Sequence, residues 1–121
     1  MHLATKLDEI ALGDVIGDGH CVALVRHAAD LGHTSTWRRG GAVLGAGLER
    51  GTCIATFSDE GRYENRTDGA SHACVFLEES GNAIRVLDQW KGKRVSERVI
   101  RAKNGAGTAN DDADRYFVIE T

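Results

Sequence analysis

Proline is absent from this sequence of 121 residues, and aromatic residues make up only 6% of it. Because no proline ring can fix a turn, the turns must depend on the chain's 15 glycines, which reach backbone conformations that other residues avoid. With few aromatic side chains, the core must consist mainly of Val, Ile, Leu and Ala. Hydrophobic residues still make up 41% of the chain, which argues against disorder and for a single domain over residues 1–121.

The sequence also lacks a strong excess of one charge and any long hydrophobic run. A formal net charge of −3 gives no general case for nucleic-acid binding. No apolar segment is long enough to span a membrane, and the N-terminal residues lack the apolar run of a signal peptide. We therefore expect no nucleic-acid partner, no membrane insertion, and synthesis in the cytoplasm without a signal peptide.

Cysteine is scarce too, because the chain has only three and no C-x-x-C pair that would suggest zinc. Cys53 and Cys74 lie inside apolar segments and are interpreted as buried thiols, with a disulfide feasible only if their strands are neighbours. Cys21 differs because it follows a Gly-containing turn and begins an apolar helical pattern. Unpaired N–H groups and the dipole at a helix start favour a thiolate, so Cys21 is a candidate nucleophile. The alternative is that Cys21 is a core thiol.

Hydrophobic periodicity predicts one clear helix and several strands. Apolar residues recur at helical spacing from Cys21 to Leu31, with Gly32 as a stop, and a short helix is expected at 3–10. The Gly-rich segment 34–50 is expected to be irregular. Runs rich in β-forming residues predict strands at 52–57, 71–77, 83–90, 94–101 and 115–119. This order predicts an α+β fold in which the helix bearing the cysteine packs on a sheet of four to five antiparallel strands.

Among the five histidines, His72 is the best candidate for the base that a cysteine nucleophile needs. It opens a predicted strand, where it would be held rigidly and yet face the end of the sheet. His20 is adjacent to Cys21 and would point away from it. His27 lies on the polar side of the predicted helix, and His33 lies beyond its end. A histidine at a strand start can also be purely structural, so the prediction for His72 depends on Cys21.

A third residue should orient the imidazole, and alternation along 83–90 favours Asp88 over Gln89. Asp88 follows the apolar face that contains Val86, where a carboxylate is unusual unless something pairs with it. In an antiparallel hairpin the end of 83–90 lies beside the start of 71–77, so Asp88 would be a cross-strand neighbour of His72. Gln89 would point to the opposite face, and its replacement by alanine is expected to matter much less.

Four segments together resemble the papain-like cysteine amidohydrolases of bacterial cell walls, the CHAP and NlpC-type families. They are Gly19-His20-Cys21-Val22-Ala23-Leu24-Val25, Gly51-Thr52-Cys53-Ile54-Ala55-Thr56-Phe57, Ser71-His72-Ala73-Cys74-Val75 and Val86-Leu87-Asp88-Gln89-Trp90. The chain looks most similar to a small single-domain bacterial group related to the amidase effectors of type VI secretion. The resemblance covers roughly residues 15–119.

The resemblance implies a papain-like fold and a cysteine amidase that hydrolyses amide bonds of peptidoglycan stem peptides. Carried over residue by residue, Cys21 corresponds to the nucleophile, His72 to the base and Asp88 to the orienting residue. No metal or other cofactor is implied. An exported protein would act in the periplasm of a target cell and would have a cognate immunity protein that occupies its cleft. Two positions depart from the common pattern, because many relatives have Glu or Asn in place of Asp88 and a polar residue other than histidine at position 20.

Two other functions remain open from the residues alone. One is a papain-like binding module that has lost turnover, and the other is a zinc site built from Cys21, His72 and Asp88. The basic residues between 91 and 103 would suit an anionic polymer, although a solvated hairpin face is the commoner meaning of such a run. These residues are Lys91, Lys93, Arg94, Arg98, Arg101 and Lys103.

Overall fold

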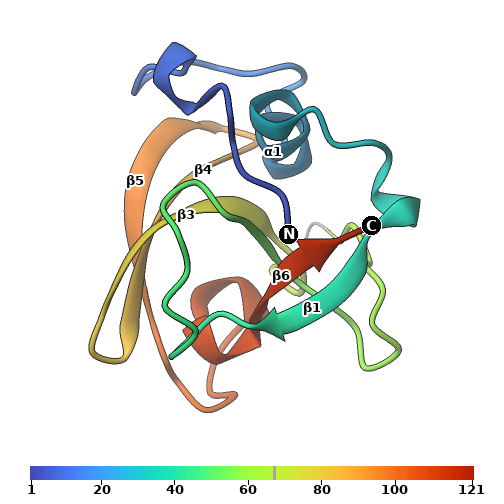
Figure 1. Cartoon of the computed structure of the whole chain (residues 1–121), viewed down its shortest axis with the longest axis vertical. Coiled ribbons are helices and arrows are strands. Elements are labelled where there is room, and N and C mark those ends of the chain that lie inside the picture. Colours follow the sequence, from blue (N-terminus) through green and yellow to red (C-terminus); the bar gives the residue numbers. More distant parts are fainter. Residues whose placement is uncertain (67) are drawn as a thin grey trace.

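The computed structural model describes residues 1–66 and 68–121 and contains one α-helix and one antiparallel sheet (Figure 1). The helix α1 is Cys21–Ala29. The strands are β1 Arg38–Ala42, β2 Cys53–Thr56, β3 Ala73–Ser80, β4 Ala83–Trp90, β5 Lys93–Arg101 and β6 Tyr116–Glu120. Short 3₁₀ turns lie at Leu7–Glu9, Thr34–Thr36, Ala109–Asp111 and Ala113–Arg115. The α+β class and the order of the elements are as predicted.

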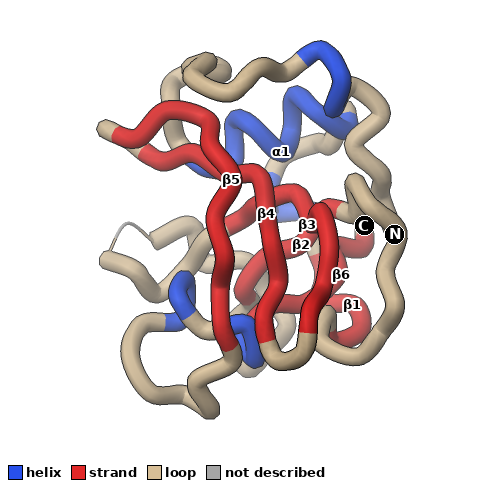
Figure 2. Tube along the Cα trace, turned by 90° about the vertical axis from the view of Figure 1, so that its left-hand side faces the viewer, coloured by secondary structure: helices blue, strands red, loops and turns tan. Residues whose placement is uncertain are grey.

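The sheet has six strands in the order β1-β6-β2-β3-β4-β5. Strands β3, β4 and β5 are joined by tight turns, and Figure 2 shows them as neighbouring, strongly curved strands. Val75 faces Leu87 and Phe76 faces Val86, so the start of β3 lies beside the end of β4. This register brings the residues before β3 close to the last residues of β4, where the candidate site lies.

Both faces of the sheet are covered, and each cover forms its own core. Helix α1 packs against β3 and β4 through its buried face, made by Leu24, Val25 and Ala28 (Figure 2). The opposite face is covered by residues from the β1–β2 and β5–β6 connections, and Tyr116 is fully buried there. Because alternate residues of a strand point to opposite faces, β2, β3 and β4 each contribute to both cores.

Strand β1 was not predicted, because its sequence Arg-Arg-Gly-Gly-Ala has neither alternation nor β-forming residues. It is an edge strand held by pairing with β6. A Cβ on Gly40 would lie 2.8 Å from the carbonyl oxygen of Val118, so the close approach of the two backbones needs a glycine there. Glycine, which suggested that segment 34–50 is irregular, is therefore the residue type that permits strand β1.

Other boundaries differ from the predictions as well, and β3 runs from Ala73 to Ser80 rather than over 71–77. The segment 3–10 contains only the 3₁₀ turn, because its first residues pair with the chain before β2, as in the bond from the Ala4 N–H to the Gly51 carbonyl of 2.7 Å. Helix α1 ends two residues early, because Asp30 adopts a left-handed conformation with φ of 53°. In the described part of the chain no helix has the length and apolar character to cross a membrane.

Candidate active site

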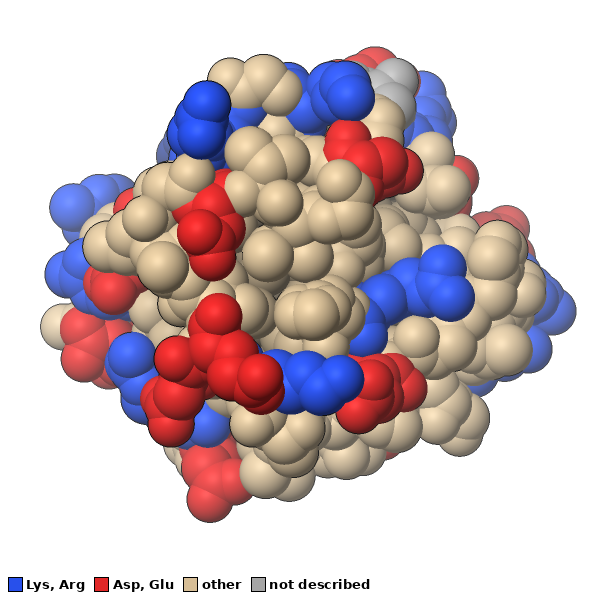
Figure 3. Space-filling view, turned by 90° about the horizontal axis from the view of Figure 1, so that it is seen from above, with Lys and Arg blue, Asp and Glu red and all other residues tan. Residues whose placement is uncertain are grey.

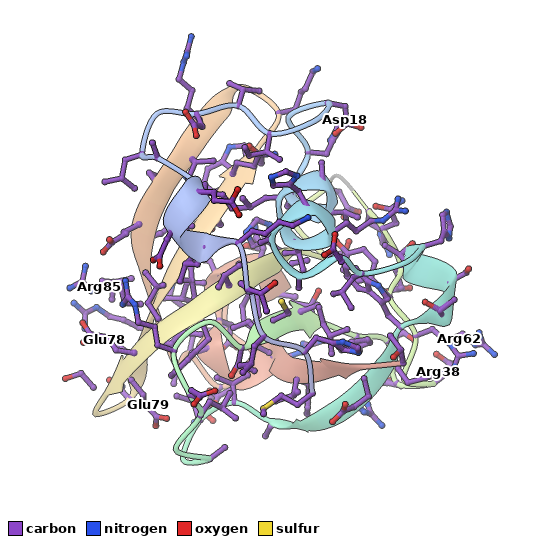
Figure 4. All side chains as sticks on the ribbon, turned by 45° about the horizontal axis from the view of Figure 1, so that its top comes forward. Asp18, Arg38, Arg62, Glu78, Glu79 and Arg85 are labelled. Carbon is purple, nitrogen blue, oxygen red and sulfur yellow. The ribbon has the colours of Figure 1, made fainter. Side chains whose placement is uncertain are left out.

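Cys21 is the first residue of α1, as the sequence predicts, and a tight loop delivers it there. In that loop the Asp18 carboxylate accepts a hydrogen bond of 3.0 Å from the His20 N–H, and Gly19 has a φ of 87° that favours glycine. Figure 4 labels Asp18 on this loop. His20 caps the helix without a side-chain hydrogen bond, so the helix start stays open around a partly buried thiol.

His72 lies directly before β3 and is buried. Its backbone is fixed by Thr56 of β2, because the Thr56 hydroxyl accepts from the His72 N–H and the Thr56 N–H donates to the His72 carbonyl, both at 3.0 Å. Its ring Nε2 lies 2.9 Å from Oδ2 of Asp88. With Nε2 engaged by a carboxylate, the neutral imidazole carries its proton there, and Nδ1 is the nitrogen free to accept a proton.

Asp88 is fully buried and is surrounded by cations as well as by His72. Arg98 Nε donates to Oδ2 at 2.9 Å, and Lys93 Nζ donates to Oδ1 at 2.9 Å. Both cations also lie over the ring of Trp90, at 4.4 Å for Lys93 and 5.2 Å for Arg98. A buried carboxylate so fully paired is held in one orientation, so it can in turn fix the imidazole.

The basic run between 91 and 103 is divided, because Lys91, Arg94, Arg101 and Lys103 are exposed whereas Lys93 and Arg98 are half-buried. Lys93 and Arg98 turn inward to Asp88, Lys103 pairs with Asp111, and Lys91 Nζ donates to the Asp18 carbonyl at 3.1 Å. Elsewhere basic and acidic side chains are intermingled on the face that Figure 3 shows.

The charges in the site favour an ionised thiol beside a protonated imidazole. Burial acts to raise the pKa of the Cys21 thiol, but hydrogen bonding to His72 and its positive charge, with the Tyr63 hydroxyl, hold that pKa below its ordinary value. Burial acts to lower the pKa of His72, but Asp88 and Cys21 raise it overall. Asp88 itself has a pKa of about 2, because His72 and Arg98 outweigh the effect of burial.

Cys21 and His72 line the same open cleft of about 560 Å³ at the ends of β3 and β4. Trp90 forms part of its wall, and Arg66 and Lys91 contribute positive charge. None of the described residues that line it is acidic. A second hollow of about 390 Å³ meets the first at His20, on the other side of the helix start.

One residue that the sequence reasoning missed also supports the thiol. The Tyr63 hydroxyl lies 3.5 Å from Cys21 Sγ, and its ring packs against Trp37 with centroids 5.2 Å apart. Tyr63 comes from the loop after β2, where no periodic pattern could place it. Gln89 faces away from His72, as predicted, and binds the loop before α1 through Ile16 and His20.

The other two cysteines cannot form a disulfide in this fold. Their strands are neighbours, and Cys53 pairs with Val75 while Cys74 pairs with Ile54. The Cys53 side chain lies in the core under α1, whereas that of Cys74 lies in the core on the opposite face of the sheet. Burial raises the pKa of Cys53 to about 12 and that of Cys74 well above its ordinary value. Both are therefore inert thiols, in contrast to Cys21.

A zinc site on Cys21, His72 and Asp88 is not favoured by this geometry. Both carboxylate oxygens of Asp88 already accept hydrogen bonds from Lys93, Arg98 and His72, and the one imidazole nitrogen that faces Asp88 is used in that contact. Among the described residues no group of three or more His, Cys, Asp or Glu side chains is arranged to hold a metal ion.

Comparisons with known proteins agree with the resemblance seen in the sequence. The type VI secretion amidase effector 2 protein of Salmonella typhi is 40% identical over 119 residues, which cover 87% of this chain and 88% of that protein. The domesticated amidase effector 2 of Ixodes scapularis is 36% identical over 105 residues, covering 83% of this chain and 70% of that protein.

A solved structure, the type 6 secretion amidase effector 2, superposes with a TM-score of 0.82 at 34% identity and covers 98% of this chain and 94% of its own. The papain-like fold expected from the sequence is therefore the fold of this protein. The family model described as domesticated amidase effector 2 matches residues 4–119, which leaves only the ends of the chain outside it. This protein thus belongs to the domesticated amidase effector 2 family.

Proposed function

We propose that this protein is a cysteine amidase that hydrolyses an amide bond in the peptide stems of peptidoglycan, with Cys21 as nucleophile, His72 as base and Asp88 as the residue that orients His72. The observation that carries the proposal is that a helix-start thiol lines one cleft with His72, whose ring is bonded to the buried Asp88. The names of the relatives, which are amidase effectors, supply the reaction class.

The charges and positions of the three residues suit a two-step acyl transfer. The Cys21 thiolate attacks the amide carbon, and the developing oxyanion lies within reach of the unpaired N–H groups at the start of α1. The imidazolium of His72 gives its proton to the leaving nitrogen, which departs as an amine and leaves a thioester on Cys21. His72 then removes a proton from water, which attacks the thioester and releases the carboxylic acid and the thiolate.

The lining of the cleft supports an anionic peptide as substrate. Arg66 and Lys91 place positive charge on the side of the cleft that holds Cys21 and His72. Stem peptides carry free carboxylates beside their amide bonds, so Lys91 gives complementary charge, whereas Arg66 already pairs with Asp68. The second hollow beyond His20 would accept the part of the stem on the other side of the scissile bond.

The relatives named for type VI secretion also suggest where the protein acts. We propose that it passes through a contractile secretion apparatus and acts on peptidoglycan in the periplasm of a target cell. A cognate immunity protein in the producing cell would block the cleft over Cys21.

Digestion of purified muropeptides, followed by mass spectrometry of the products, tests the proposed function. The wild-type protein is expected to convert a stem peptide into two fragments whose masses sum to the substrate plus one water. Cys21→Ala and His72→Ala should both abolish this conversion, because members of such a unit fail together rather than additively. His27→Ala, an exposed position on the same helix, is the matched control and should keep full activity.

The alternative, a binding module without turnover, gives a different result in the same experiment. Such a module would bind muropeptides and leave their masses unchanged. Intact muropeptides after prolonged incubation with folded wild-type protein would reject the amidase in favour of the module.

A further inference from the structure

Gln89 is the most fully bonded polar side chain of the site that the proposed reaction does not use. It lies near the end of β4 and is only 1% exposed. Its Oε1 accepts from the Ile16 N–H at 3.0 Å, and its Nε2 donates to the carbonyls of Ile16 at 2.8 Å and His20 at 2.9 Å. The side-chain amide is therefore bonded at both ends to the loop that leads into α1.

One of these three bonds fixes the peptide unit that joins His20 to Cys21. The His20 carbonyl accepts from Gln89 and also from the Ala23 N–H at 3.2 Å, so both of its acceptor directions are occupied. In a trans peptide the carbonyl and the following N–H point in opposite directions. Holding the His20 carbonyl toward Gln89 therefore directs the Cys21 N–H away from the sheet and toward the open helix start.

That N–H belongs to the residue that carries the nucleophile. Cys21 is the first residue of α1, and the first N–H groups of a helix have no intrahelical acceptor. A carbonyl carbon attacked by Cys21 Sγ would place its oxygen within reach of this group. The direction of the His20–Cys21 peptide thus decides whether the helix start can stabilise the oxyanion.

Apart from Gln89, local bonds hold that peptide: the Ala23 N–H donates to the His20 carbonyl at 3.2 Å, and the His20 N–H donates to the Asp18 carboxylate at 3.0 Å. Gly17 and Gly19 both have positive φ values, 58° and 87°, and glycine rotates with little steric resistance. Backbone bonds also attach the loop to β5, but farther from Cys21: the Gly13 N–H donates to the Val95 carbonyl and the Val95 N–H to the Asp14 carbonyl, both at 2.9 Å. From outside the loop, the exposed Lys91 bonds only the Asp18 carbonyl, at 3.1 Å. Gln89 supplies the buried side-chain attachment next to Cys21, through the His20 carbonyl.

We propose that Gln89 is a positioning residue that holds the His20–Cys21 peptide with its N–H directed to the oxyanion. The inference rests on the proposed amidase function. It also revises the expectation that Gln89 matters little because it faces away from His72, since the face it points to is the one that carries the loop before Cys21. Asp88 and Gln89, adjacent on β4, then orient the two halves of the site separately.

The test compares hydrolysis with simple alkylation of the thiol in Gln89→Met, which keeps the length of the side chain and removes all three bonds. Hydrolysis of a muropeptide needs an oxyanion donor, whereas alkylation of Cys21 by iodoacetamide needs only the thiolate. We expect kcat to fall about 10- to 100-fold with KM changed less, because a misdirected donor loses part of the 10²- to 10³-fold effect of an oxyanion hole. The alkylation rate at pH 6 should stay within about threefold of wild type.

Two further variants separate positioning from general destabilisation. Gln89→Glu still accepts from the Ile16 N–H at neutral pH but donates to neither carbonyl, so it should lose kcat as Gln89→Met does. If Gln89→Met does not fold, the kcat of Gln89→Glu tests the positioning role. Ile84→Val, a buried change at the far end of β4, is the control for lost packing and should keep wild-type kcat below its unfolding temperature.

The experiment separates failure of the positioning role of Gln89 from failure of the proposed amidase function. Wild-type kcat in Gln89→Glu, or equal losses of hydrolysis and alkylation in both Gln89 variants, would overturn the positioning role while the amidase stands. No hydrolysis by the wild-type protein would overturn the proposed function first. Loss of hydrolysis with alkylation retained supports the inference.

Discussion

Asp88 is a buried carboxylate with three partners, and this surrounding decides what its replacement should do. It binds His72, Arg98 and Lys93, and its pKa of about 2 keeps it ionised at any pH at which the protein would work. Its negative charge stabilises the imidazolium of His72, and its position fixes which ring nitrogen faces Cys21.

Asp88→Asn should therefore reduce kcat by about 10- to 10⁴-fold while the fold persists. The amide keeps the shape of the side chain but loses the charge, and its NH₂ group can favour the wrong tautomer of His72. The acid limb of the plot of kcat/KM against pH should also change, because the pKa of His72 loses the contribution that raises it. A near-wild-type profile for Asp88→Asn would show that the carboxylate does not orient the base.

At the residue scale, the sequence could place those side chains whose neighbours follow from periodicity. Cys21 follows from a helix start, and His72 with Asp88 follows from the register of a hairpin. Tyr63 and Arg98 could not be placed in the same way. Tyr63 reaches Cys21 from an irregular loop, and Arg98 lies in a strand where its inward direction depends on the pairing of β5 with β4.

Strand β5 lies at the edge of the sheet and is bonded to the site through Arg98. Arg98 donates to Asp88 and also to the Asn110 carbonyl at 3.2 Å, so one side chain ties β4, β5 and the segment before β6 together. The Tyr116 hydroxyl donates to the same carbonyl at 2.7 Å. Since Asn110 lines the cleft, this set of bonds shapes its wall as well as its charge.

Arg98→Met should lower the free energy of unfolding by about 1–3 kcal/mol, because it leaves a buried carboxylate with one hydrogen bond fewer. Arg101→Met, an exposed position on the same strand, should change it by less than about 0.5 kcal/mol. Urea denaturation of both variants measures the difference. Equal stabilities for the two would mean that Lys93 and His72 are sufficient partners for Asp88.

At the element scale, the strands with alternating or continuous apolar residues were predicted close to their observed bounds, and β4 was predicted without error. Strand β1 and the N-terminal segment were not, because both are defined by backbone pairing with distant residues. Gly40 permits the approach of β1 to β6, and Leu3 pairs with Thr52. No local pattern contains those partners.

The stability of the whole molecule should depend on pH through the ionisation of Asp88. A carboxyl group whose pKa is lower in the folded state stabilises the fold above its unfolded pKa, and that contribution is lost as the pH falls through the folded pKa. For Asp88 the window runs from its ordinary value of 3.8 down to about 2, and the contribution is about 2 kcal/mol.

Thermal unfolding followed between pH 5 and about pH 2 in wild type and Asp88→Asn isolates this contribution. Other carboxyl groups titrate in both proteins, so the difference between the two curves belongs to Asp88. The gap in Tm should narrow as the pH falls. A difference in Tm that stays constant over this range would mean that the pKa of Asp88 is not lowered in the folded protein.

The whole-molecule arrangement was the part most accessible to the sequence. One helix followed by antiparallel strands predicted the α+β class, and the resemblance of four segments to the papain-like amidohydrolases implied the papain-like fold. The order of the strands in the sheet and the covering of its second face were not accessible, because β6 inserts between β1 and β2 from the far end of the chain (Figure 1).

The central claim is that Cys21, alone among the three cysteines, is an activated nucleophile. Its most direct test is the rate of alkylation by iodoacetamide at pH 6, with each labelled cysteine identified by peptide mass and muropeptide hydrolysis followed in the same samples. Cys21 should react far faster than Cys53 and Cys74, whose thiols are buried with raised pKa values, and activity should fall in proportion to its labelling. Hydrolysis that continues undiminished after complete alkylation of Cys21 would contradict the claim.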